Sequence, residues 1–223
     1  MINISDRLKT VAQLVLKEQS NGIIDVGCDH ALLDIYLLQN NNNLRIVASD
    51  LREKPLENAK KNIEKYSFLN KIELKLQDGL GILDDYIDTI IIAGMGEDTI
   101  RDILIKGKRY LKQIKRIVIS SNSKFPLVRK EINSLGFVIN DERIVYEEDK
   151  YYIIMEFIKG NKEYNIEELF FGPILLNNKD EMFYKYYNYI KNVDKKILGS
   201  LPIEHDKRNN IEEDIKMLDK YLI

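Results

Sequence analysis

The sequence predicts an α/β fold: a mostly parallel sheet with an antiparallel last strand, followed by an α-helical coiled-coil hairpin. Up to about residue 120, short apolar runs alternate with amphipathic stretches, which is typical of parallel strands joined by helices. From 136 to 155, two apolar runs flank a polar turn and predict a β-hairpin. Beyond Gly172-Pro173, apolar residues recur every three or four positions, which indicates helices.

In chain order, the first element is an amphipathic helix behind the capping residues Ser5-Asp6. Pro126 suits the first turn of a later helix. Strands are predicted near 22–27, 44–49, 71–76, 88–93 and 116–120, and helices near 30–40, 53–66, 97–112 and 126–134.

Gly160-Asn161-Lys162 is the expected domain boundary, so we predict a cofactor-binding domain over 1–160 and a helical domain over 161–223. In the second region, two narrow apolar seams flank a Gly/Pro turn at 199–202, as an antiparallel coiled-coil hairpin requires. We expect these seams to bury only each other.

Composition narrows the class of protein. The chain has 223 residues, a net charge of −2, one cysteine and two histidines. A single cysteine excludes an internal disulfide, and the residue types give no zinc-ligand spacing. No apolar stretch is long enough for a membrane span, and the N-terminus has no signal-like block. We therefore expect a cytoplasmic protein, a monomer, that binds neither membrane nor metal.

Acids and glycines follow four of the predicted strands. In an open α/β sheet, ligands bind where the carboxyl ends of the strands splay apart. Each of these turns alone could have only a structural role, but four in succession predict a binding site. The segments are Asp25-Val26-Gly27, Ser49-Asp50, Gln77-Asp78-Gly79 and Ala93-Gly94-Met95-Gly96.

The spacing from Gly27 to Asp50 places an acid where such folds hold a ribose. The dinucleotide fingerprint G-x-G-x-x-G is absent, and Asp29 would repel a pyrophosphate at the following helix. A cofactor with an ammonium and a sulfonium tolerates that charge, which points to S-adenosylmethionine. We expect Asp50 to bind the ribose, Asp78 the adenine amino group, and the backbone of Ala93 and Gly94 the methionine end. The remaining predicted cofactor contacts are Asp25, Gly27, Cys28, Asp29, His30, Leu51, Gln77, Gly79 and Met95.

The net charge of the chain is −2, so the protein as a whole does not attract a nucleic acid. A nucleic acid would have to bind at local groups of basic residues. Arg7, Lys124 and Arg129 are predicted near the functional edge, and the tail interleaves tyrosines with Lys185, Lys191 and Lys195. A solvated coiled-coil face explains the tail lysines almost as well. The densest basic cluster, 106–116, is expected at the sheet edge opposite the cofactor.

Four segments together resemble the TrmK family of bacterial tRNA (adenine-22-N1)-methyltransferases: 25–31, 77–80, 92–96 and 147–149. The resemblance spans residues 4 to 158 in motifs, and the tail in pattern only. It implies a Rossmann-like class I methyltransferase domain, a C-terminal coiled-coil domain, and methyl transfer from S-adenosylmethionine to N1 of an adenosine in tRNA. The chain departs from the family pattern at Cys28, Asp34, Glu97 and Ser120-Ser121.

The chemistry of this reaction needs positioning more than a strong base, because adenine N1 attacks with its own lone pair. We expect Asp29 and Asn122 to form the pocket that receives the adenine. Both could instead shape only a helix start and a turn. The alternatives are a methyltransferase for a small molecule or another RNA, a non-catalytic RNA-binding protein, and an NAD enzyme.

Overall fold

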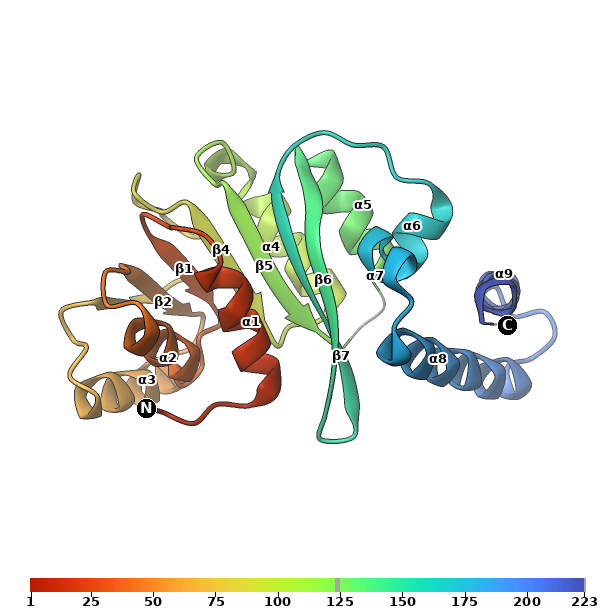
Figure 1. Cartoon of the computed structure of the whole chain (residues 1–223), viewed down its shortest axis with the longest axis horizontal. Coiled ribbons are helices and arrows are strands. Elements are labelled where there is room, and N and C mark those ends of the chain that lie inside the picture. Colours follow the sequence, from red (N-terminus) through yellow and green to blue (C-terminus); the bar gives the residue numbers. More distant parts are fainter. Residues whose placement is uncertain (123–124, 223) are drawn as a thin grey trace.

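The computed structural model describes residues 1–122 and 125–222. Within them, seven strands form one sheet in the order β3-β2-β1-β4-β5-β7-β6 (Figure 1). The pairs β5–β7 and β7–β6 are antiparallel and the other four pairs are parallel, which confirms the predicted mostly parallel sheet. The strands are β1 Ile23–Val26, β2 Ile46–Asp50, β3 Ile72–Leu76, β4 Thr89–Ala93, β5 Arg116–Ser121, β6 Phe137–Glu147 and β7 Lys150–Lys159.

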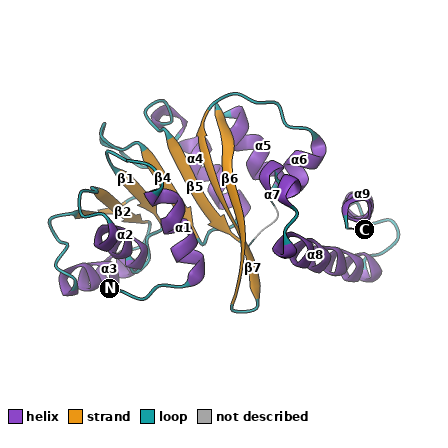
Figure 2. Cartoon of the chain, in the orientation of Figure 1, coloured by secondary structure: helices purple, strands orange, loops and turns teal. Residues whose placement is uncertain are grey.

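Helices cover both faces of this sheet (Figure 2). Every residue of β1, β2 and β5 is buried, as expected for central strands with helices on either side. One apolar core joins the sheet to α1 Asp6–Leu16, α2 Leu32–Asn40 and α3 Glu53–Lys65. The opposite core includes α4 Glu97–Lys106 and α5 Pro126–Ser134.

Two predicted boundaries are wrong. The helix expected to run to 112 ends at Lys106, and Gly107 separates it from a short 3-10 turn, η1 Lys108–Tyr110. The C-terminal helices begin earlier than Gly172, at Ile166. There Asn165 and Glu168 form a reciprocal capping box at the start of α6 Ile166–Phe171. A second short helix, α7 Pro173–Asn178, follows.

The helical hairpin consists of α8 Glu181–Ser200 and α9 Lys207–Tyr221, which pack against each other. The expectation that its seams bury only each other is wrong for the first half of α8. There Phe183, Tyr186 and Tyr187 join the same core as α5, with Phe171 packed among them. The start of the tail is therefore continuous with the sheet's core, and the boundary near Gly160 stays a prediction.

Arg129, predicted as a substrate contact at the functional edge, lies inside the protein. Its side chain is fully buried, and its Nε donates to Glu142 Oε1 at 2.9 Å. Its Nη1 donates to the carbonyls of Leu169 and Phe170, the last turn of α6. Glu142 Oε2 also accepts from the backbone of Ile174 at 3.1 Å, so the pair fastens α6 and α7 to the sheet. The sequence marks this arginine as basic but gives no sign of its burial.

Removing either partner should leave an uncompensated buried charge. We expect Glu142→Ala or Arg129→Ala to lower the free energy of unfolding by about 3–5 kcal/mol. Urea denaturation followed by circular dichroism measures this. Lys185→Ala, which removes the exposed ion pair with Glu181, is the matched control and should leave the midpoint unchanged. Equal stability of Glu142→Ala and the unmodified chain would contradict the proposed fastening.

Candidate active site

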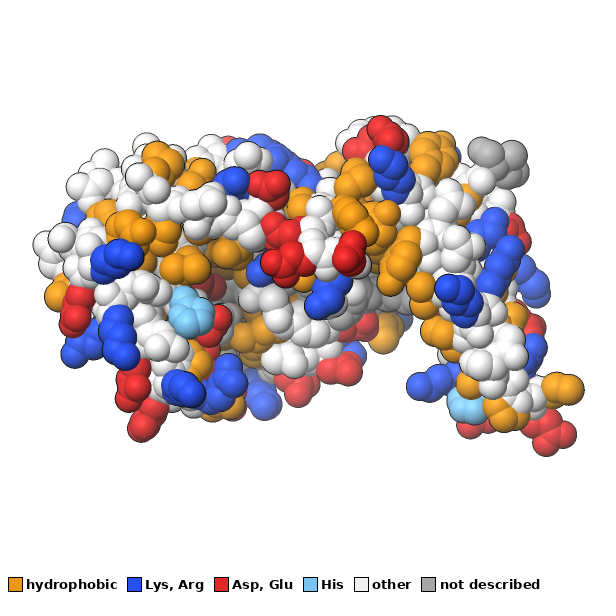
Figure 3. All heavy atoms as spheres, turned by 90° about the horizontal axis from the view of Figure 1, so that it is seen from below, with side chains coloured by type: hydrophobic (Ala, Val, Ile, Leu, Met, Phe, Trp, Pro, Cys, Tyr) orange, Lys and Arg blue, Asp and Glu red, His pale blue; other side chains and the backbone are white. Residues whose placement is uncertain are grey.

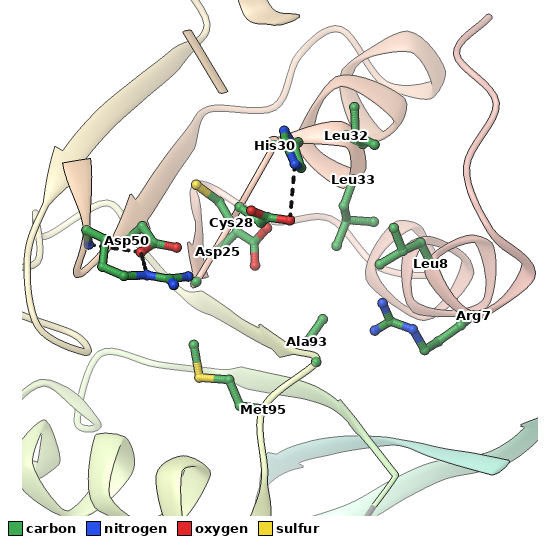
Figure 4. A pocket seen from close by; sticks show the side chains of 14 residues that line it. Arg7, Leu8, Asp25, Cys28, His30, Leu32, Leu33, Asp50, Ala93 and Met95 are labelled. Carbon is green, nitrogen blue, oxygen red and sulfur yellow. Dashed lines mark hydrogen bonds and ion pairs between the residues drawn. The ribbon is translucent and has the colours of Figure 1, made fainter. Parts of the chain in front are cut away.

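A cavity of about 440 Å³ opens at the edge where β1, β2 and β4 end (Figure 4). A second, of about 200 Å³, adjoins it and shares Gly27, Asp50, Arg52 and Met95. Together they form one elongated cleft. The first is lined by Arg7, Leu8, Asp25, Gly27, Cys28, Asp29, His30, Leu32, Leu33, Asp50, Arg52, Ala93, Gly94 and Met95. The second adds Val26, Leu51, Gln77, Asp78, Gly79, Thr99 and Ile103.

The turn after β1 forms the floor of the cleft. Gly27 has a φ of +77°, and a Cβ there would lie 2.2 Å from Cε of Met95. The conformation therefore favours glycine, and the end of the Met95 side chain packs directly against it. Asp29 and Ala31 also adopt the left-handed region, with φ of +50° and +54°. For non-glycine residues this conformation is strained and is found most often at functional sites.

Asp50, the last residue of β2, lies between the two cavities and is 7% exposed. Its Oδ1 accepts from the backbone N–H of Arg52 at 2.9 Å, and Arg52 Nε lies 3.7 Å from the same oxygen. The carboxylate is thus held in place by its own loop while keeping acceptor capacity for a ligand. This arrangement suits the hydroxyls of a ribose.

Asp25, at the inner wall, is 4% exposed. Burial raises its pKa to about 7; Arg7 opposes this shift and Asp50 adds to it. Behind it, Asp34 is fully buried on α2, where burial and Asp25 raise its pKa well above the usual range. Cys28 is also buried, which raises the pKa of its thiol and keeps it neutral. In the protein without a ligand, the buried carboxyl groups of Asp25 and Asp34 are therefore not both ionised at neutral pH.

Arg7 of α1 points into the cleft from the opposite wall (Figure 4). Its guanidinium lies 5.0 Å from the ring of Tyr152, and its Nε is 4.0 Å from Glu147. Nη1 is buried and has no hydrogen-bond partner among the described residues. A buried guanidinium nitrogen without a partner is costly, so Nη1 is available to an acceptor on a ligand beside Gly94.

Asp29 and His30 stand at the mouth of the cleft. The Asp29 side chain is 65% exposed, and its Oδ2 lies 3.6 Å from His30 Nε2. Asp29 does not cap α2, whose N-cap is Ala31, without a side-chain hydrogen bond. The interpretation of Asp29 as a helix cap is therefore excluded, and its exposed side chain lines the first cavity.

At the other end of the cleft, Gln77 is fixed by a hydrogen bond from its Nε2 to the carbonyl of Leu80 at 3.1 Å. Asp78 is exposed there. A third cavity, of about 190 Å³, places Lys106 and Arg109 with Asp78 and Gly79. The first part of the basic cluster, Lys106 and Arg109, thus lies beside the loop after β3. Its last residues, Lys115 and Arg116, lie at the start of β5, at the edge opposite the cofactor, as predicted.

Some predicted site residues do not line the cleft. Asn122 directly follows β5 and is exposed at the functional edge. Lys124 lies outside the described residues. Lys185 pairs with Glu181, Lys191 pairs with Asp219 of α9, and Lys195 is exposed on α8. Arg52, which the sequence also places near the functional edge, lines both cavities. The prediction missed Thr99 and the apolar wall of Leu8, Leu32, Leu33 and Ile103, whose side chains carry no motif.

Comparison with known proteins decides the family. The model of the TrmK family, tRNA (adenine(22)-N(1))-methyltransferase, matches residues 23–220. The chain belongs to this family. A Bacillus subtilis tRNA (adenine(22)-N(1))-methyltransferase is 28% identical over 193 residues, covering 82% of this chain and 79% of the relative.

Solved structures are similar over the whole length. TrmK of M. capricolum, in complex with the cofactor product S-adenosylhomocysteine, has a TM-score of 0.84 at 33% identity, covering 98% of this chain and 97% of that one. A Streptococcus agalactiae protein of the NADB-Rossmann superfamily has a TM-score of 0.90 at 30% identity, covering 100% and 98%. This TrmK-family chain therefore has a Rossmann-like methyltransferase fold that uses S-adenosylmethionine.

The cleft of this TrmK-family chain fits S-adenosylmethionine. The acids of the cleft suit a cofactor with two positive groups, Arg7 Nη1 can donate to its carboxylate, and the apolar side of the second cavity suits an adenine. Within residues 1–122 and 125–222, no cluster of three or more potential ligands could hold a metal ion. No helix in that part of the chain is long and apolar enough to cross a membrane.

Asp50 should be essential for cofactor affinity. In Asp50→Ala, we expect S-adenosylmethionine binding to weaken at least about tenfold, or 1.4 kcal/mol, because the ribose hydroxyls lose their acceptor. Isothermal titration measures this. Asp85→Ala, an exposed acid that lines none of the three cavities described above, is the control. Unchanged affinity in Asp50→Ala would remove Asp50 from the site.

The raised pKa of Asp25 predicts a pH-dependent affinity. Between the ordinary value of 3.8 and about 7, the folded protein keeps this carboxyl protonated while the unfolded chain ionises it, so the free protein loses stability as pH rises through this range. A cationic cofactor favours the ionised form. S-adenosylmethionine should therefore bind more tightly as pH rises through about 7, with proton release.

Titrations in two buffers of different ionisation enthalpy would detect the released proton. The pH dependence should be smaller in Asp25→Asn, and smaller for S-adenosylhomocysteine, which lacks the sulfonium charge. Affinity that is independent of pH, with no proton release, would contradict the role of Asp25.

Proposed function

We propose that this chain methylates N1 of adenosine 22 in tRNA, in the cytoplasm, with S-adenosylmethionine as donor. The observation that carries the proposal is the acid-rich cleft at the ends of β1, β2 and β4, in a chain whose residues 23–220 match the TrmK family. When bound, the cofactor supplies an electrophilic methyl group. The chain's own residues bind, orient and shield the reactants.

The proposed cofactor contacts follow the order of the cleft. Arg7 holds the carboxylate at one end, Asp25 faces the positive groups, and Asp50 binds the ribose. The adenine lies in the second cavity, near Asp78. Gly27, Cys28, His30, Leu51, Gln77, Gly79, Ala93, Gly94 and Met95 complete the proposed set.

The target adenine is proposed to enter between Asp29 and Asn122. In the sheet, β4 lies between β1 and β5, so these residues flank the turn at Ala93-Gly94. The exposed carboxylate of Asp29 can stabilise the positive charge that adenine acquires as N1 is alkylated. Asn122 can both donate and accept, which matches an adenine edge. Neither residue has to remove a proton before attack, because the N1 lone pair is free.

The helical tail is proposed to bind tRNA and not the cofactor. The tail cannot be tested by cutting the chain at Lys159, because Phe171 and Phe183 belong to the main core. Lys185 and Lys195 are exposed on α8 and suit phosphate contacts. Lys191 is half-buried against Asp219, so its contribution would be to hold α8 to α9.

Variants of the two pocket residues test the proposal. Asp29→Asn and Asn122→Ala should cut turnover on unmodified tRNA by about a hundredfold or more, the scale of a lost transition-state contact. Cofactor affinity should stay within a few fold. Mass spectrometry of digested tRNA measures both the amount and the identity of the product.

Asp85→Asn and Asn42→Ala, exposed residues of the same types in loops that line none of these cavities, are the matched controls and should be fully active. Normal turnover in both pocket variants would place the adenine elsewhere. N6-methyladenosine as the product would overturn the proposed target atom.

A further inference from the structure

Three tyrosines form a continuous aromatic surface where the β6–β7 hairpin meets α8. Tyr146 and Tyr151 are cross-strand partners with ring centroids 4.6 Å apart. The ring centroid of Tyr189, on α8, lies 5.2 Å from that of Tyr151. We call Tyr146, Tyr151 and Tyr189 the tyrosine platform. In Figure 3, hydrophobic side chains gather where the sheet part joins the projecting tail.

The exposed rings of the platform are not needed to pack the tail against the sheet. Tyr186, which lies 5.5 Å from Tyr151, is buried and already anchors the hairpin to α8. Tyr146 and Tyr189 remain 49% and 48% exposed. The hydroxyl of Tyr146 donates to Asp149 at 3.1 Å, which fixes the ring while leaving its surface open. Such exposed and ordered aromatic rings are suited to stacking.

The tip of the hairpin lies beside the cleft, because Glu147 is 4.0 Å from Arg7, and Arg7 lines the cofactor cavity. Tyr146 and Tyr151 are next to this tip, on the face of the hairpin opposite to Tyr152, whose ring contacts Arg7. The closed end of the hairpin points to the same edge of the sheet at which the parallel strands end (Figure 1). A polynucleotide with one base in the cleft would therefore run past these tyrosines.

Methylation at N1 requires that the nucleotides next to the target adenosine lose a stacking partner. N1 is on the Watson–Crick edge of adenine, so the target must leave any base pair and stack before it reaches the cleft. The nucleotides on either side then lose a neighbour. Aromatic side chains can replace such a neighbour for any base, because every base has a π-face.

We propose that the tyrosine platform stacks an unpaired base of the tRNA adjacent to the target adenosine. This inference rests on the proposed function. Local charge supports bases over phosphates: Glu147, Glu148 and Asp149 at the hairpin tip repel a phosphate backbone, whereas a neutral base face can approach. Lys150 and Lys185 beside the platform are placed to meet the phosphates that flank the stacked base.

Substitutions that keep apolar bulk but remove the ring separate stacking from packing. In Tyr146→Leu and Tyr189→Leu, we expect KM for tRNA to rise about tenfold, within the range reported for one base–aromatic contact. Turnover at saturating tRNA and S-adenosylmethionine affinity should stay within about threefold. Tyr146→Phe and Tyr189→Phe should behave like the unmodified enzyme. Tyr184→Leu is the control, because Tyr184 is an exposed tyrosine of α8 whose ring packs against Phe183.

A second readout does not depend on activity. With 2-aminopurine in place of the nucleotide next to the target, fluorescence should stay quenched on binding to the unmodified enzyme and increase with the Leu variants. Unchanged KM and unchanged fluorescence in both Leu variants would overturn the platform. Equal losses in the Phe and Leu variants would also overturn it, because the hydroxyls would then be responsible. Absence of any tRNA methylation by the unmodified enzyme would instead overturn the proposed function.

Discussion

The site depends on the burial of several carboxyl groups at one sheet edge. Asp25, Asp34 and Asp50 are each less than a tenth exposed, and Arg7 is the cation that faces Asp25 across the cleft. Burying like charges together is unfavourable, and the free protein responds by keeping Asp25 partly protonated at neutral pH. A cofactor with a sulfonium and an ammonium relieves this cost. The edge is thus complementary in charge to S-adenosylmethionine and opposed to a pyrophosphate.

The rest of the fold holds Arg7 in position. At the C-terminal end of α1, Arg116 donates to the carbonyls of Leu14 and Val15 while paired with Glu156. At the N-terminal end, the backbone N–H of Asp6 donates to Glu147 of the β6–β7 hairpin at 2.8 Å. Because α1 is fastened at both ends, the single arginine can face the acids without being drawn into solvent. The hairpin that fastens α1 also carries the tyrosine platform, so cofactor and polynucleotide would meet the same element.

The parallel strands and the position of the cleft could be predicted from the sequence, because each depends on residues that are close together in the chain. Acids and glycines after apolar runs located the cleft, since parallel strands end at one edge, and Asp50 and Gly27 lie where their spacing placed them. The failures concern long-range burial. Nothing in the sequence around Arg129 shows that Glu142 will neutralise it, or that Phe183 leaves the hairpin seam for the main core. Likewise, nothing in the sequence shows that Lys106 and Arg109 lie beside Asp78.

The central claim is that this edge selects a cationic nucleoside cofactor by charge. The most direct measurement is a titration of the intact chain with S-adenosylmethionine, ATP and NAD under the same conditions. We predict that S-adenosylmethionine binds at least about a hundredfold more tightly than either phosphate compound, a difference of about 2.7 kcal/mol. Binding of NAD as tight as that of S-adenosylmethionine would contradict the account, because the acids would then not determine which cofactor binds.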